Sequence, residues 1–410
     1  MGNKTLWIIS ELYYPETTST GYILTQLAEG LSSCFTVNVI CSQPTYSARG
    51  TKAPVQEVRH GVNIRRCWGT TLEKDILSFR LINLVTITVS IFFSALRHLK
   101  RDDLALVVTN PPALPFAIAL ACRLKQARCS LIVHDVYPDL AIAAGKLKAN
   151  SLLAGILDRL NTKLYCGMEY IFVLGRDMQV KISERLDRRK DRVVIATNWA
   201  DLDLVMPGER GENVLLTELG LKDQFVLQYA GNIGYPNDIK TIIEAATYLK
   251  DRKDIHFLFI GSGARKREIE LAIIDGSLSN ITILPPRPRT DQSNFLNACD
   301  VALIALVDGM KGVSVPSRTY NTLAAGKPII AIVEPGSELA MVIEEEGVGW
   351  RVTPGHPEEL VSAILAARSQ PDLLAQMGKR ARKVAESKYS FEGVLQVFRT
   401  TLLGSNNDPT

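Results

Sequence analysis

Short apolar runs alternate with longer helical patterns along nearly the whole chain. Runs such as LALVV, SLIV and IFVL are apolar at every position, which is typical of strands buried on both faces of a parallel sheet. Helical patterns such as Gly21–Leu31 and Leu114–Lys125 separate them and predict an open, doubly wound α/β sheet. In the first half the predicted strands are Thr5–Ile9, Thr36–Cys41, Val62–Cys67, Leu104–Thr109, Cys129–Asp135, Tyr170–Leu174 and Arg192–Ala196.

The stretch 198–213 interrupts this alternation with a proline, two glycines and charges, and we interpret it as a linker. We therefore expect a first Rossmann-like domain at 1–200, which faces acceptor and membrane, and a second at 201–385. Residues 386–410 are expected to form a C-terminal helix that packs back across the junction. Two such domains would place a ligand-binding cleft between the carboxyl ends of their sheets. The strands predicted in the second domain are Phe225–Tyr229, His256–Ile260, Ile281–Leu284, Val301–Leu306 and Pro328–Val333.

Composition narrows the class of protein. The 410 residues are 46% apolar and 22% charged, which excludes a disordered chain. The seven Cys and five His form no CxxC or HExxH pattern, so we expect reduced thiols and no metal site. The first residues lead directly into a strand pattern without the layout of a signal peptide, which predicts a cytoplasmic protein.

The net charge of +4 conceals an asymmetry. Residues 1–200 carry 25 Lys/Arg and 16 Asp/Glu, a net +9, whereas the remaining 22 basic and 27 acidic residues give −5. The basic half either faces an anionic partner, such as nucleic acid or a lipid surface, or is an uneven solvated surface.

The segment 76–101 favours a lipid surface as the anionic partner. Its central 16 residues, Leu81–Leu96, carry no charge, and Arg80 and Arg97 flank them. A spanning helix needs about 20 apolar residues, so we expect a helix in the membrane interface or one buried against the sheet. Together with the basic cluster 185–192, this segment predicts a protein bound peripherally to anionic lipid on the inner face of the plasma membrane.

The loop after the first predicted strand, ELYYPETTSTGYIL, opens a helix near Gly21. Free backbone N–H groups at such a helix start suit a phosphate or sugar hydroxyls, although a Ser/Thr cap alone would also explain the pattern. The loop is not GxGxxG, which argues against a dinucleotide. His134 and Asp135 follow another buried strand; they are candidates for proton transfer or for a hydrogen-bonded turn.

Three segments of the second half also indicate ligand binding. The turn Gly231-Asn232-Ile233-Gly234 follows one strand, and Gly261 follows the next, where glycine allows close backbone approach. In DGMKGVSVPSRTYNTLAAGKP, Lys311 and Gly312 precede a helix expected to begin at Pro316–Ser317, with Ser317 as its cap. Arg318 on its first turn is positioned to bind a diphosphate.

With these motifs in order, the sequence resembles the family 4 retaining glycosyltransferases, whose fold is the two-domain GT-B architecture. The resemblance runs from YYPETTSTGYILTQLAEGL through VHDVYPD, NWAD and YAGNIG to VPSRTYNTLAAGKPIIA and GWRVTPGHPEEL. It is strongest to the branch that builds O-antigen, capsule and exopolysaccharide.

The resemblance implies a nucleotide sugar, usually a UDP-sugar, bound in the second domain, and a lipid-linked or glycan acceptor in the first, with no nucleic acid. Gly21 would lie near the donor phosphates, His134 near the anomeric carbon, and Gly231 and Asn232 beside phosphate and ribose. Arg287 would lie beside the base, and Arg318 would replace the diphosphate-binding lysine.

The sequence also departs from the family pattern. Where many members carry two glutamates, it has Val313 and Asn321; Asn321 can still bond a ribose hydroxyl. Where many carry a basic pair, it has Asn232 and Asn237, which places phosphate neutralisation on Arg318 and Lys311.

The implied reaction is hexosyl transfer with retention, without a cofactor and without a metal, because no suitable acidic pair follows a strand of the donor half. Two alternatives stay open: a sugar-nucleotide epimerase of the same fold, and a catalytically silent subunit that binds nucleotide or lipid.

Overall fold

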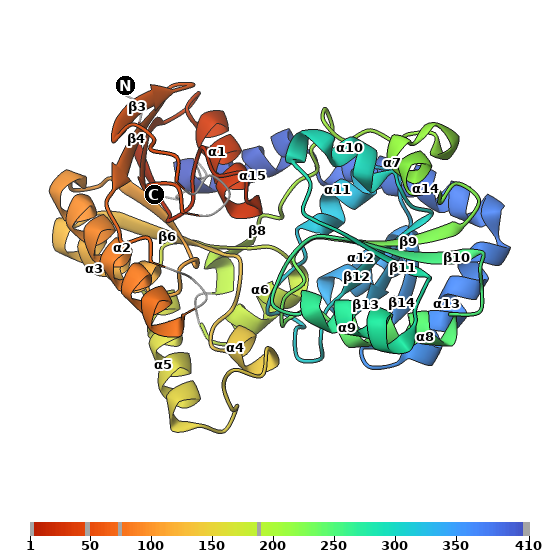
Figure 1. Ribbon diagram of the computed structural model, residues 1–410. Coiled ribbons are helices and arrows are strands. Elements are labelled where there is room, and N and C mark those ends of the chain that lie inside the picture. The colour runs from red at the N-terminus through yellow and green to blue at the C-terminus, as the bar shows by residue number, and fades with distance from the viewer. Residues whose placement is uncertain (1–3, 46–49, 73–75, 187–189, 405–410) are drawn as a thin grey trace. The chain divides into compact units, whose positions relative to one another are not determined.

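The computed structural model describes residues 4–45, 50–72, 76–186 and 190–404, which fall into two compact units, each built around its own sheet (Figure 1). Unit 1 comprises Met1–Tyr137, Leu152–Thr197 and Val394–Thr410, and unit 2 comprises Pro138–Ser151 and Asn198–Gly393. The chain thus passes four times from one unit to the other, whereas the sequence suggested boundaries only near residues 200 and 385. Each unit is described by itself below.

Unit 1 contains an eight-stranded sheet in the order β3-β4-β2-β1-β5-β6-β7-β8. All neighbours are parallel except β3, which pairs antiparallel with β4. The strands are β1 (Thr5–Ile9), β2 (Thr36–Ser42), β3 (Gln56–Arg59), β4 (Val62–Cys67), β5 (Leu104–Val108), β6 (Arg128–Val133), β7 (Ile171–Val173) and β8 (Val193–Ile195).

Helices cover this sheet. Helix α2 packs against β2 and β4, and α3 packs against β5 and β6. The helices are α1 (Ser19–Leu31), α2 (Leu77–His98), α3 (Leu114–Lys125), α5 (Leu152–Cys166), α6 (Arg176–Ser183) and α15 (Phe391–Leu403), with a short 3-10 turn η1 (Lys190–Arg192).

Unit 2 contains a six-stranded parallel sheet in the order β11-β10-β9-β12-β13-β14. The strands are β9 (Phe225–Ala230), β10 (Ile255–Ile260), β11 (Ile281–Leu284), β12 (Val301–Ala305), β13 (Ile329–Ile332) and β14 (Gly349–Val352). The helices are α4 (Asp139–Ala143), α7 (Val214–Glu218), α8 (Ile239–Tyr248), α9 (Lys266–Gly276), α10 (Gln292–Leu296), α11 (Arg318–Ala324), α12 (Glu338–Glu346), α13 (Pro357–Ser369) and α14 (Pro371–Lys388), with 3-10 turns η2 (Arg210–Glu212) and η3 (Arg289–Asp291).

Several details differ from the sequence expectations. Strand β6 ends at Val133, so His134 and Asp135 lie just beyond it. In the expected C-terminal segment, α14 ends at Lys388 and α15 begins at Phe391. The expected linker is bonded within unit 2: Gly208 N donates to Asn297 Oδ1 (3.0 Å), and Arg210 Nε lies 2.8 Å from Asp300 Oδ1. Edge strands β3 and β14 were not predicted.

Candidate functional site

The carboxyl edge of the unit 2 sheet contains a topological switch point. From the central strand β9 the chain proceeds to β10 and β11 on one side, and then returns to β12, β13 and β14 on the other. In open α/β sheets the crevice outside the strand ends at such a point is where ligands bind. The turn at 231–238, after β9, and the segment from β12 to α11 both leave the sheet at this edge.

Arg318, the first residue of α11, connects these two segments. Its Nη2 donates to Asn237 Oδ1 (3.1 Å), and its guanidinium carbon lies 4.4 Å from the centre of the Tyr229 ring. Its Nη1 is buried and has no hydrogen-bond partner among the described residues. A buried donor on a permanently charged group is costly to leave unpaired, so this atom favours an anionic ligand.

The Arg318 guanidinium lies so close to residue 231 that only glycine fits there. A Cβ at Gly231 would lie 3.2 Å from Arg318 Cζ, and the glycine has a φ of 142°, which other residues rarely adopt. The structure thus brings together Gly231 and Arg318, two residues that were each expected at the donor phosphates.

Gly261 serves the packing of two turns against each other. A Cβ there would lie 1.9 Å from the carbonyl oxygen of Gly231, and Gly261 N donates to Leu284 O (3.0 Å). The glycine that the sequence suggested for close ligand approach is thus needed for close approach of backbone to backbone. Its predicted contact with a donor remains a prediction.

Asn232 is exposed at the tip of the turn, and its backbone carbonyl is well bonded. That oxygen accepts from Tyr229 Oη (2.7 Å) and from Asn237 Nδ2 (3.1 Å). Burial raises the pKa of Tyr229, so the hydroxyl keeps its proton and donates at neutral pH. Tyr229 and Asn237 thus fix the turn and the guanidinium together.

The remaining residues of the β12–α11 segment lie as follows. Ser317 occupies the N-cap position of α11, as predicted, but its side chain makes no capping hydrogen bond, so the expected cap interaction is wrong. Lys311 is exposed; its backbone N–H donates to Glu334 Oε2 (2.9 Å), and its Nζ would lie 2.9 Å from a Cβ placed on Gly336. Gly312 has a φ of 68°.

Three further residues of the donor half already have structural partners. Asn321 Oδ1 accepts from Asp201 N (2.7 Å), which holds the 198–206 segment to α11. Arg287 Nη1 donates to Asp291 Oδ2 (2.6 Å). Val313 is fully buried. Asn321 and Arg287 stay candidate donor residues.

In unit 1 the loop after β1 is tightly wound. Helix α1 begins at Ser19 with Thr18 as its cap, and the Gly21 N–H donates to Thr18 Oγ1 (3.4 Å). A Cβ at Gly21 would lie 2.9 Å from the Glu16 carbonyl oxygen. The Gly21 amide, expected to be free for a ligand, is therefore already used by the cap, and glycine is required there by the turn.

His134 and Asp135 lie at the carboxyl edge of the unit 1 sheet, where β5 and β6 end. Their backbone N–H groups both donate to Thr109 Oγ1, at 3.1 and 3.3 Å. Burial lowers the pKa of His134 to about 4, so the imidazole is neutral at neutral pH and can accept or donate a hydrogen bond without charge. Thr109, which sequence reasoning missed, fixes this backbone.

Within the described residues, no group of three or more His, Cys, Asp or Glu side chains could hold a metal ion.

Comparison with known proteins decides the family. The model of the glycosyl transferases group 1 matches residues 217–384, the part of unit 2 that contains Arg318 and both glycine turns. A probable glycosyltransferase of Pseudomonas aeruginosa, WbjE, is 32% identical over 291 residues, 71% of this chain and 72% of that protein. The chain belongs to the group 1 glycosyl transferases.

Two other similarities extend over nearly the full length of this glycosyltransferase. WcaI of Escherichia coli K12, whose name assigns it provisionally to colanic acid biosynthesis, is 26% identical over 408 residues, 96% of this chain and 98% of that protein. Anabaena HepE, crystallised with UDP and glucose, has a TM-score of 0.74 at 14% identity and covers 98% of this chain and 100% of its own. The predicted GT-B fold is thereby confirmed.

Proposed function

We propose that this glycosyltransferase is of the retaining, family 4 type and moves a hexosyl group from a UDP-sugar to a lipid-linked or glycan acceptor in cell-surface polysaccharide synthesis. The observation that carries the donor assignment is the unpaired, buried Nη1 of Arg318 at the switch point of unit 2. The names of WbjE and WcaI and the UDP complex of HepE support the same class of donor and product.

In the proposed reaction, the bond between the anomeric carbon and the diphosphate oxygen breaks, and its electron pair goes to the diphosphate. A bond from the acceptor oxygen forms on the same face, and the acceptor proton leaves with the diphosphate. Arg318 stabilises the growing negative charge as a preorganised cation, so that no metal is required. We propose that His134 and Asp135 of unit 1 act on the transferred sugar, and we name no covalent nucleophile.

UDP binding measured by isothermal titration calorimetry tests the donor assignment. Arg318→Ala should weaken binding about 10- to 100-fold, because it removes a charge-assisted contact of about 1.5–3 kcal/mol. Arg252→Ala is the matched control: Arg252 is exposed and precedes β10, at the opposite edge of the same sheet. Equal affinity of the Arg318 variant and the wild type would refute the diphosphate role.

A catalytically silent, nucleotide-binding subunit is the second candidate, because Val313 is buried and the Asn321 amide oxygen is occupied by Asp201. Release of nucleoside diphosphate from a panel of UDP- and GDP-sugars, with and without a polyprenyl-diphosphate-linked acceptor, separates the two. Tight UDP binding without release from any donor would favour the silent subunit. Retained turnover in EDTA would support transfer without metal.

A further inference from the structure

Three helices of unit 1 carry an unusual number of exposed apolar side chains. Helix α3 packs against both α2 and α5, and Figure 1 shows α2, α3 and α5 on one side of this unit. We call the outward side of these helices the three-helix face. Its exposed large apolar side chains are Leu81, Ile82, Val85, Val89, Phe93, Leu120, Leu124, Leu152, Leu153, Ile156 and Leu160.

Helix α2 is divided between two environments. Ile87, Ile91 and Ala95 are buried, whereas Val85 and Phe93 are 56% and 62% exposed. By length and composition Ser78–His98 could cross a membrane, and it is the one such stretch among the described residues. Because its inner side packs against β2 and β4, it cannot be surrounded by lipid, and its apolar outer side suits the membrane interface instead.

The charge of the three helices is almost entirely positive. They contain six Lys or Arg residues and a single acidic residue, Asp158. Asp158 is paired with Arg185, outside these helices, at 3.0 Å. None of the six basic residues pairs with a carboxylate in the part of the chain that the structure describes. The basic residues are Arg80, Arg97, Arg123, Lys125, Arg159 and Lys163.

A groove of about 640 Å³ lies where α3 and α5 end and β6 begins. Exposed Arg123 and Lys163 line it, next to the exposed side chain of Leu120. Two other arginines of the lining are held in place: Arg128 Nε donates to Glu169 Oε2 (2.7 Å), and Arg192 Nη1 donates to Met168 O (3.2 Å). The groove therefore offers two unpaired cations beside apolar surface, which suits a phosphate that carries acyl chains.

We propose that the three-helix face docks on a bilayer that contains anionic phospholipid. The exposed apolar side chains enter the interfacial region, and headgroup phosphates bind at Arg123 and Lys163. A second copy of the chain is a poorer occupant, because two such faces would bring like charges together. The proposal rests on the proposed function in one respect: an enzyme with a lipid-linked acceptor must reach that acceptor at a membrane. The residues proposed to contact lipid all belong to unit 1. Of the basic cluster 185–192, also expected at lipid, residues 187–189 lie outside the described residues.

Sedimentation of the full-length protein with sucrose-loaded vesicles tests this. The protein should sediment with vesicles of phosphatidylglycerol and phosphatidylcholine, and far less protein should sediment with vesicles of pure phosphatidylcholine. V89Q/F93Q and R123E/K163E should each lower the partition coefficient at least about tenfold, since each removes apolar area or cationic attraction. High salt should release the charge-dependent part.

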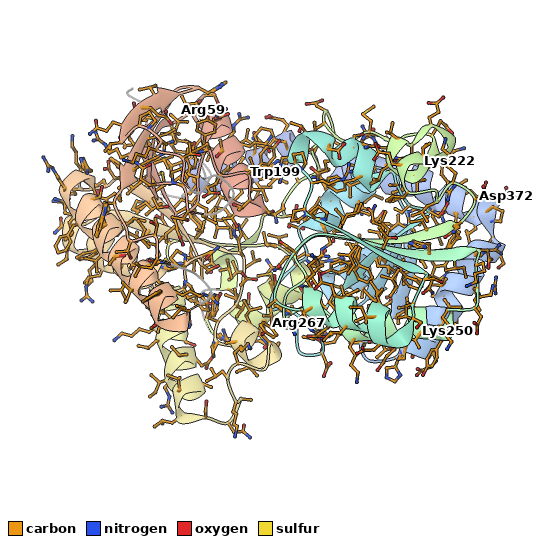
Figure 2. The ribbon with its side chains drawn as sticks, in the orientation of Figure 1. Arg59, Trp199, Lys222, Lys250, Arg267 and Asp372 are labelled. Carbon is orange, nitrogen blue, oxygen red and sulfur yellow. The ribbon has the colours of Figure 1, made fainter. Side chains whose placement is uncertain are left out.

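Matched controls lie in unit 2. I274Q changes an exposed apolar residue of α9. K222E/K250E reverses the charge of two exposed lysines, which Figure 2 labels. Neither control should change vesicle binding. UDP affinity and the unfolding midpoint of every variant show whether it is folded.

The proposal is overturned if the face variants bind vesicles as wild type does. It is overturned equally if they only abolish a dimer in light scattering. Normal UDP binding with no vesicle binding would refute the docking surface and leave the donor site standing.

Discussion

At the scale of single residues, the candidate donor site depends on two glycines for different reasons. Gly231 leaves room for the Arg318 guanidinium, and Gly261 leaves room for the carbonyl of Gly231. The position of the guanidinium therefore depends on the close packing of the turn after β9 against the turn after β10. A ligand that pairs with Arg318 Nη1 would meet a group that is already oriented by Asn237 and Tyr229.

Replacing Gly261 by alanine should disrupt this arrangement. The added Cβ would lie 1.9 Å from Gly231 O, which only a backbone shift relieves, so we expect a loss of more than about 3 kcal/mol and weaker UDP binding. Gly220→Ala is the control: it also has a positive φ of 67° but no atom within 4 Å of the new Cβ, and should cost only about 1–2 kcal/mol. Urea denaturation measures both, and equal losses would show that strain rather than the clash dominates.

His256 of β10 should make the protein sensitive to acid. The residue is 5% exposed, its Nε2 lies 2.8 Å from Thr282 Oγ1, and burial lowers its pKa from 6.5 to about 4. Below pH 6.5 His256 binds a proton in the unfolded chain, whereas in the folded protein it stays neutral until near pH 4. The free energy of unfolding therefore falls as the pH is lowered from 6.5 to about 4. The contribution is complete well above pH 6.5 and is on the order of 3 kcal/mol.

Unfolding free energies of wild type and His256→Gln between pH 7 and pH 4 check this prediction. The variant should lose less stability on acidification, although His134, with a similarly lowered pKa, retains part of the effect. Identical pH dependence of the two proteins would contradict the assignment.

The sequence indicated that some candidate donor residues come together, but it did not indicate their hydrogen-bond partners. Gly231 and Arg318 meet as expected, because strand-end glycines and a basic first turn are local signals. The bond from Asn321 to Asp201 and the pairing of Arg287 with Asp291 depend on how distant segments pack, and no local pattern contained them. Tyr229 could have been noticed as an aromatic residue two positions before Gly231.

At the scale of the elements, most strands were predicted near their observed positions. Strands β1, β4 and β11 have the bounds expected, although only β1 is largely buried along its length, and β11 lies at a sheet edge. Strand β3 (Gln56–Arg59) was missed because QEVR is polar and lies at an edge, and β14 because GWRV is short and half-buried. Edge strands need only one partner and little apolar sequence.

Helix α2 shows the limit of such reasoning. Its composition indicated either an interfacial or a buried helix, and the structure shows a helix with one buried side and one exposed apolar side. Apolar residues occur on all sides of α2, so the hydrophobic pattern could not separate the side against the sheet from the exposed side. Only the contacts with β2, β4 and α3 distinguish them.

At the scale of the whole molecule, unit 1 is completed by the last helix of the chain. Helix α15 contributes buried Val394, Phe398 and Leu402; the Phe398 ring lies 4.4 Å from that of Phe172, centre to centre. Arg399 Nη2 also donates to the carbonyl oxygen of Gly30 (3.2 Å). The sequence indicated an amphipathic C-terminal segment, but periodicity alone does not say which distant sheet covers it.

Unit 1 should therefore not reach its native stability without α15. A chain that ends at Ser390 leaves apolar surface of unit 1 uncovered, so we expect loss of its cooperative unfolding transition. In the full chain, Phe398→Ala should cost about 3–5 kcal/mol, whereas exposed Gln396→Ala should be nearly neutral. Urea denaturation followed by the fluorescence of Trp7, buried in β1, reports on this unit when Trp68, Trp199 and Trp350 are replaced by phenylalanine. An unchanged transition in the truncated chain would mean that α15 covers the core of unit 1 without stabilising it.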